Sequence, residues 1–193
     1  MMPHKRYAPR CAPVLSALVS VALILAPDHL AAQSAQRVSL QASGEWISPT
    51  KDYGVTLPAT STLGREVQAR FTAGPFSVGA GYQRSTVFKS DAADVTGTLS
   101  MGFLEPRIVV VVVAQRVAPY LAGRVGYGSL LIPERPSTHE NVVSYGGGAG
   151  VLVAVVPRVA VDLGGQYFVT DFRTQGGSAG YWLARLGLAV GLF

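Results

Sequence analysis

The chain has 193 residues, of which 49% are hydrophobic and only 14% are charged, and its net charge is +5. This length suits one domain rather than two. Soluble α/β enzymes usually carry about a quarter charged residues, so the composition speaks against that class. The positive surplus is mild, and no basic cluster is interleaved with aromatic residues, so a nucleic-acid-binding protein is not indicated either.

Residues 1–32 have the layout of a secretory signal peptide. A basic segment comes first and contains His4, Lys5, Arg6 and Arg10. An apolar segment, 12–26, follows and ends at Pro27, and small residues stand at Ala31 and Ala32. We predict cleavage after Ala32, which leaves residues 33–193 as the exported domain. The alternative is a single membrane anchor, but the apolar segment is shorter than the roughly 20 residues that such a span needs.

Cys11, the only cysteine, lies within this predicted signal. The exported part would then have no thiol, and therefore no disulfide, no thiolate metal site and no cysteine nucleophile. Its 13 basic and 10 acidic side chains would leave a net charge of +3.

After residue 33 the sequence alternates between apolar and polar residues with a period of two, which is typical of strands with two different faces. In the segment 37–47, for example, Val38, Leu40 and Trp46 alternate with Gln41 and Glu45. We predict eight strands in all, at 37–47, 63–72, 76–88, 95–113, 117–131, 142–156, 159–170 and 181–193. The connections between them alternate between tight turns and longer polar loops.

These predicted strands are mostly 10 to 15 residues long, whereas globular strands average about 5 to 6. A tilted strand that crosses a bilayer needs about 9 to 11 residues. In hydrocarbon every backbone polar group must be paired internally, so the sheet must close. The sequence therefore predicts an all-β fold, an eight-stranded antiparallel transmembrane up-and-down β-barrel after a cleaved signal peptide. A soluble barrel with an inward apolar face, of the lipocalin kind, is the alternative.

Three features resemble the small outer-membrane barrels of the OmpA/OmpX-type superfamily, and the likeness extends over the whole exported part. They are the segment 117–128 (VAPYLAGRVGYG), the segment 146–151 (GGGAGV) and the terminal Phe193. The resemblance implies a location in the bacterial outer membrane, contact with its lipid, and recognition of Phe193 by the barrel-assembly machinery. Phe193 departs from the pattern in one respect, because it shares the parity of Arg185 rather than that of the apolar Leu188.

If the apolar faces meet lipid, the opposite faces put charged residues inside the barrel. These are Glu45, Glu66, Arg70, Arg124, Asp162 and Arg185, joined by Glu105 and Arg107 if a bulge near 103–106 reverses the faces of that strand. Buried charges persist only when they are paired, so we predict an internal salt-bridge network that fills the bore. A polar conduit for small solutes is the functional alternative.

We expect a non-enzymatic, monomeric outer-membrane protein with a structural or surface-interaction role and no cofactor. Its one histidine after residue 32, His139, lies in a polar loop, and no serine is spaced to share a strand face with it. A lipid-modifying enzyme of this membrane is therefore the weaker alternative. With one histidine and no cysteine, the exported part offers no set of metal ligands.

Overall fold

The computed structural model describes residues 37–50, 61–90, 95–131, 139–173 and 177–192. The predicted signal peptide (residues 1–32), the predicted start at Gln33 and the predicted assembly signal Phe193 lie outside the described residues. So does most of each long loop between strands.

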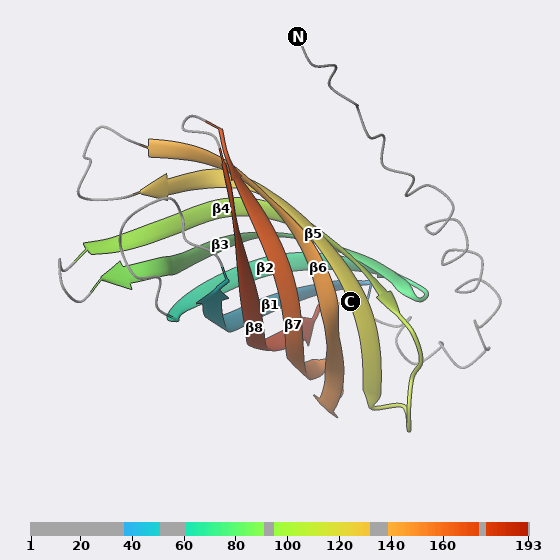
Figure 1. Cartoon of the computed structure of the whole chain (residues 1–193). Coiled ribbons are helices and arrows are strands. Elements are labelled where there is room, and N and C mark those ends of the chain that lie inside the picture. The colour runs from blue at the N-terminus through green and yellow to red at the C-terminus, as the bar shows by residue number, and fades with distance from the viewer. Residues whose placement is uncertain (1–36, 51–60, 91–94, 132–138, 174–176, 193) are drawn as a thin grey trace, which may run out of the picture.

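The described residues form eight antiparallel strands that close into a barrel, in which each strand pairs with its neighbours in sequence and β8 pairs back with β1 (Figure 1). The strands are β1 (Val38–Pro49), β2 (Thr62–Ala73), β3 (Phe76–Ser90), β4 (Val95–Val109), β5 (Val117–Leu131), β6 (His139–Val156), β7 (Val159–Phe172) and β8 (Ser178–Gly191). This confirms the predicted fold class. No helix among the described residues is both long and apolar enough to cross a membrane.

The strands contain 12 to 18 residues, which is longer than a bilayer crossing requires. Most lie close to the predicted ranges, with one clear exception. The predicted strand 95–113 ends at Val109, and the following valines belong to the connection to β5. Ala114 and Gln115 in this connection both have positive φ angles, 50° and 55°, which the tight reversal requires.

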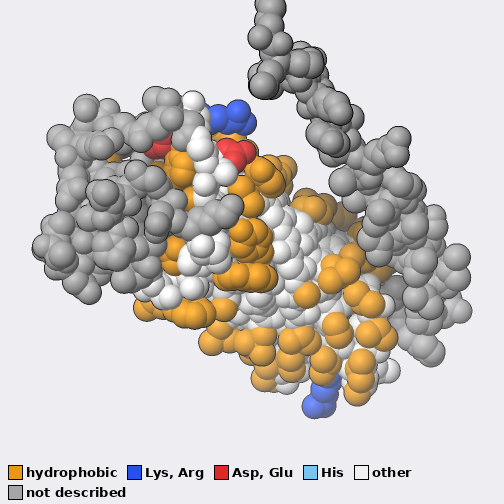
Figure 2. Space-filling model, viewed as in Figure 1, with side chains coloured by type: hydrophobic (Ala, Val, Ile, Leu, Met, Phe, Trp, Pro, Cys, Tyr) orange, Lys and Arg blue, Asp and Glu red, His pale blue; other side chains and the backbone are white. Residues whose placement is uncertain are grey.

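The outer wall of the barrel is apolar. Alternate residues along each strand expose large hydrophobic side chains, among them Leu40, Val78, Leu121 and Leu188, each about half exposed. Figure 2 shows apolar side chains spread over the face of the barrel in view, with few charged side chains among them. Exposed aromatic side chains on the same wall include Trp46, Tyr82, Tyr127, Tyr145 and Trp182. An outward apolar band with aromatic residues is the pattern of transmembrane barrels, since lipid replaces water around them.

The predicted bulge at 103–106 is wrong. The pairing of β4 with β3 runs without a shift from Phe103 to Ile108, and the irregularity on β3 lies instead between Thr86 and Phe88. Leu99, Met101 and Phe103 are buried on the same face as Glu105 and Arg107. The prediction assumed that apolar residues must face lipid. The loop end of this bore is filled by apolar side chains, so β4 keeps one parity throughout.

Candidate functional site: an ionic network in the barrel interior

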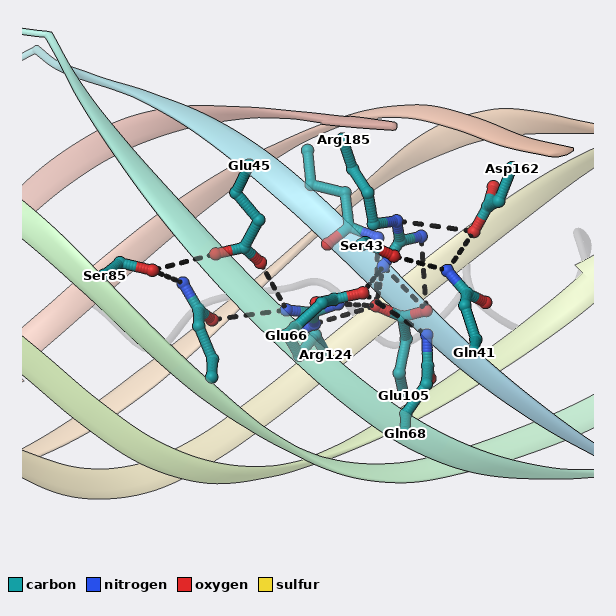
Figure 3. A network of polar contacts seen from close by, with 12 residues as sticks. Gln41, Ser43, Glu45, Glu66, Gln68, Ser85, Glu105, Arg124, Asp162 and Arg185 are labelled. Atoms are coloured by element: carbon teal, nitrogen blue, oxygen red, sulfur yellow. Dashed lines mark hydrogen bonds and ion pairs between the residues drawn. The ribbon is translucent and has the colours of Figure 1, made fainter. Parts of the chain in front are cut away.

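The six charged residues that the sequence placed inside the barrel are buried there, at 5% exposure or less, and so are Glu105 and Arg107, without the bulge on which their inward position was predicted to depend. They come from six of the eight strands: Glu45 from β1, Glu66 and Arg70 from β2, Glu105 and Arg107 from β4, Arg124 from β5, Asp162 from β7 and Arg185 from β8. Figure 3 labels six of them, Glu45, Glu66, Glu105, Arg124, Asp162 and Arg185, whose side chains project into the bore. Four carboxylates and four guanidinium groups therefore balance in formal charge.

Glu105 is the hub of this network. Its carboxylate is 2.8 Å from Arg70 Nη2, 2.7 Å from Arg107 Nε and 3.1 Å from Arg185 Nη1, and it also accepts a 2.8 Å hydrogen bond from Arg124 Nε. All four interior arginines thus meet on one carboxylate. Gln166 Nε2 adds a neutral donor at 3.2 Å.

Glu66 joins two of the same arginines from another strand. Its carboxylate oxygens lie 2.7 Å from Arg124 Nη2 and 3.0 Å from Arg185 Nη1. The Arg124 guanidinium also lies over the ring of Phe103, with Cζ 3.9 Å from the ring centroid. This cation–π contact explains why an aromatic residue faces inward beside the charges.

Asp162 anchors the network on the side of the tight turns. Its carboxylate accepts hydrogen bonds of 2.6 Å from the Tyr120 hydroxyl and 2.6 Å from Gln41 Nε2, and it lies 3.0 Å from Arg107 Nη2. The Arg107 guanidinium lies over the Tyr120 ring at 4.4 Å. Tyr120 also accepts a 3.0 Å hydrogen bond from Arg185 Nη2, so it links two arginines to Asp162.

Glu45 is the least engaged carboxylate of the four. It accepts a 2.8 Å hydrogen bond from the Ser85 hydroxyl, and its other oxygen lies 3.7 Å from Arg124 Nη1. A charge pair at this separation contributes less than the contacts of Glu105, because it includes no hydrogen bond. Glu45 is therefore at the edge of the network.

The predicted network contained charged residues only, although alternation also places its neutral members on the inward face. They are Gln41, Ser43, Gln68, Gln83, Ser85, Tyr120 and Gln166, all buried or nearly so. Alternation could have identified them as members, since each lies on the inward face of its own strand. Each supplies donors or acceptors that the ionic groups alone leave unused.

Glycines on the inner wall make room for these long side chains. A Cβ at Gly79 would overlap Gln68 Oε1 and lie 2.7 Å from Arg70 Nη2. A Cβ at Gly150 would overlap the hydroxyl of Tyr120. The bore of an eight-stranded barrel is only just wide enough for side chains, so large residues on one wall require very small ones on the wall that they contact.

Above the network, toward the long loops, the bore has an apolar layer. Ile47, Phe168, Tyr181 and Leu183 form one buried cluster, and the rings of Phe168 and Tyr181 stack at 5.3 Å. The Tyr181 hydroxyl reaches a polar partner, Ser144 Oγ, at 3.2 Å. Side chains therefore fill the bore on the loop side of the charges as well.

At the tight-turn end the bore opens into a vestibule of about 540 Å³. Gln41, Arg70 and Arg107 line it, and all three belong to the network. The vestibule is thus bounded by the ionic groups on its inner side. Within the described residues, no group of three or more His, Cys, Asp or Glu side chains could hold a metal ion.

Comparison with known proteins supports the fold. The first structural match is Neisserial surface protein A (NspA), with a TM-score of 0.69 and 16% identity over 80% of this chain and 97% of that chain. The N-terminal β-barrel domain of Pseudomonas aeruginosa OprF (TM-score 0.49, 12% identity) covers 81% of this chain and 98% of that one. Ail of Yersinia pestis (TM-score 0.45, 14% identity) covers 79% and 96%.

The fold assignment rests on the match to NspA alone, because the TM-scores of the other two matches are below 0.5. No family model matches the chain, and no curated protein sequence matches it either. The fold is that of the small eight-stranded outer-membrane barrels, as the sequence predicted.

Proposed function

We propose that this protein is an integral barrel of the bacterial outer membrane that catalyses no reaction. It acts through envelope structure or through the loops at its outward end. The observation that carries the proposal is the combination of an apolar outer wall with an interior closed by paired charges. Such an inside-out polarity suits lipid outside and a side-chain plug inside.

The first test is heat-modifiability of the protein refolded in detergent. We expect the unboiled protein to migrate faster than the boiled protein on a gel, with β-rich circular dichroism. A protein that shows no shift and is monomeric without detergent would contradict the membrane assignment.

The second test separates a closed barrel from the narrow channel that the sequence left open. Reconstituted in planar bilayers, the closed barrel gives no steady conductance, because side chains from opposite walls meet in the bore. Steady single-channel steps would favour the transport function instead. For the enzymatic alternative, the informative result is a change in membrane lipid composition that depends on the protein and disappears in His139→Ala.

The partners of the proposed barrel are outer-membrane lipid and the barrel-assembly machinery, which would read the last strand through Phe193. This role of Phe193 follows only from the family resemblance. Phe193→Ser should lower the fraction of heat-modifiable protein in the outer membrane, whereas refolding of purified protein should be little affected. Light scattering in detergent should give a monomer.

A further inference from the structure

Two arginines lie directly opposite one another on the outer wall. Arg65 on β2 pairs with Arg84 on β3, and both side chains are exposed. Directly opposite residues on one face of an antiparallel sheet have Cβ atoms about 4.5–5.5 Å apart, and like charges there are destabilising. An anion bound between the two guanidinium groups would remove this repulsion.

The described part of the protein supplies no such anion. Of its six carboxylates, Glu45, Glu66, Glu105, Glu140 and Asp162 are buried in the interior. The sixth, Asp171, is on β7, which pairs with neither β2 nor β3. Every interior arginine has a carboxylate partner, whereas no ion pair among the described residues involves Arg65 or Arg84.

The wall around the arginine pair leaves room for a ligand. Arg65 is flanked on β1 by Gly44, and Arg84 is flanked on β4 by Ser100, so the neighbouring strands present no large side chain in this row. A hollow of about 460 Å³ is lined by both arginines, and Thr86 and Thr98 line it too. The hydroxyl groups of these threonines are additional hydrogen-bond donors for an acceptor-rich group.

The height of the pair on the wall indicates what fills the hollow. The next outward row toward the middle of the barrel is Val67 opposite Tyr82, an apolar and an aromatic residue that belong to the lipid-facing band. Two residues along a strand correspond to about 6.6 Å. One row further toward the long loops, Trp46 lies opposite Leu63, and both are exposed. The arginines therefore lie near the loop end of the apolar wall, beside an aromatic residue of the kind that marks the boundary between lipid tails and headgroups around a transmembrane barrel.

We propose that Arg65 and Arg84 form a binding site for a phosphate group on a lipid headgroup of the outer leaflet. Guanidinium groups bind phosphate oxygens through paired, charge-assisted hydrogen bonds. A lipid fits better than free phosphate, because Leu63 lines the same hollow and is 74% exposed, which gives an apolar contact beside the charges. The inference rests on the proposed location in the outer membrane.

The test uses lipid A, a phosphorylated glycolipid, added to full-length protein refolded in a neutral detergent, with bound lipid counted by native mass spectrometry. The double variant Arg65→Gln/Arg84→Gln should bind lipid A at least about tenfold more weakly, because it loses the charge-assisted hydrogen bonds from both guanidinium groups to the phosphate. The matched control, Arg37→Gln/Arg116→Gln, removes the same charge from exposed positions at the tight-turn end. It should bind like the unchanged protein.

Two ligand controls distinguish the sources of phosphate. Dephosphorylated lipid A should bind the unchanged protein and the double variant equally weakly. Inorganic phosphate at the same concentration should not compete with lipid A. Competition at equal concentration would overturn the assignment to a lipid, and equal losses of binding in both double variants would overturn the site.

A second measurement needs only one substitution, whose effect on thermal stability should reverse its sign when lipid A is added. In neutral detergent alone, Arg84→Gln should be at least as stable to heat as the unchanged protein, because it relieves like-charge repulsion. With lipid A present, it should be the less stable of the two. A variant that is less stable by the same amount in both conditions would contradict the proposal. The heat-dependent gel shift, measured on the same samples, reports separately whether the unchanged protein is a membrane barrel.

Discussion

Glu105 and Arg185 meet in the middle of the barrel, with Arg185 Nη1 3.1 Å from Glu105 Oε2. Their strands, β4 and β8, are four places apart in either direction around the closed order, so they stand on opposite walls. This contact therefore spans the bore. Because Arg70, Arg107 and Arg124 reach the same carboxylate, one acidic residue links four of the eight strands, β2, β4, β5 and β8.

The hub position predicts that Glu105→Gln is strongly destabilising. The substitution puts a neutral side chain among four buried arginines and leaves Arg70 without a carboxylate partner among the described residues. Removal of one member of a buried ionic group costs about 3–5 kcal/mol. The free energy of unfolding should be measured by urea titration in lipid vesicles, with the gel shift as the readout of folded protein. Glu45→Gln is the matched control, because the nearest guanidinium nitrogen is 3.7 Å from that carboxylate. Equal losses for the two variants would contradict the hub.

The same residues show how far the sequence could go. Alternation in β1 was enough to place Gln41, Ser43 and Glu45 inside, because every outward residue between them is apolar or glycine. Length and alternation together were enough for the barrel, since strands of this length with two different faces suit a bilayer crossing, and a sheet in hydrocarbon must close. Alternation also predicted the inward position of six of the eight charged residues without assuming a bulge.

Alternation alone could not predict which face of β4 points into the barrel. Leu99, Met101 and Phe103 are as apolar as a lipid-facing row, and nothing within the strand itself shows which face is inward. Contacts from other strands decide it: the Arg124 guanidinium covers the Phe103 ring, and Glu105 receives arginines from β2, β5 and β8. Periodicity is a local property, whereas these contacts depend on closure of the barrel.

Close packing against the network predicts opposite results for alanine at two glycines of the same barrel. Gly150→Ala on the inner wall should cost about 1–3 kcal/mol, because the new methyl group overlaps the Tyr120 hydroxyl that binds Asp162. Gly165→Ala on the outer wall meets nothing within 4 Å. It should be neutral or stabilise the strand by up to about 1 kcal/mol, because alanine restricts the unfolded chain. Urea titrations of both variants would show the difference, and a larger loss at Gly165 would contradict the packing described above.

The apolar outer wall predicts a depth-dependent penalty for charge. Val125→Arg, near the middle of β5, should cost about 2–4 kcal/mol in vesicles, whereas Leu131→Arg at the loop end of the same strand should cost about 0–1 kcal/mol. Both side chains point outward and are about half exposed. The comparison is made by unfolding in phospholipid vesicles. Equal and small costs at both positions would mean that water, not lipid, surrounds this wall.

The apolar layer at the loop end predicts that one buried hydroxyl contributes to stability. Tyr181→Phe removes the 3.2 Å contact with Ser144 Oγ but keeps the ring stacked on Phe168. A net loss of about 0.5–1.5 kcal/mol is expected for one hydrogen bond. The loss should lie toward the lower end of this range, because Ser144 Oγ still accepts a 3.0 Å hydrogen bond from Thr170 Oγ1. Tyr127→Phe, at an exposed position on the outer wall, should change the unfolding free energy by less than half as much. A larger effect at Tyr127 than at Tyr181 would show that the hydroxyl in the membrane interface, rather than the one in the bore, stabilises the barrel.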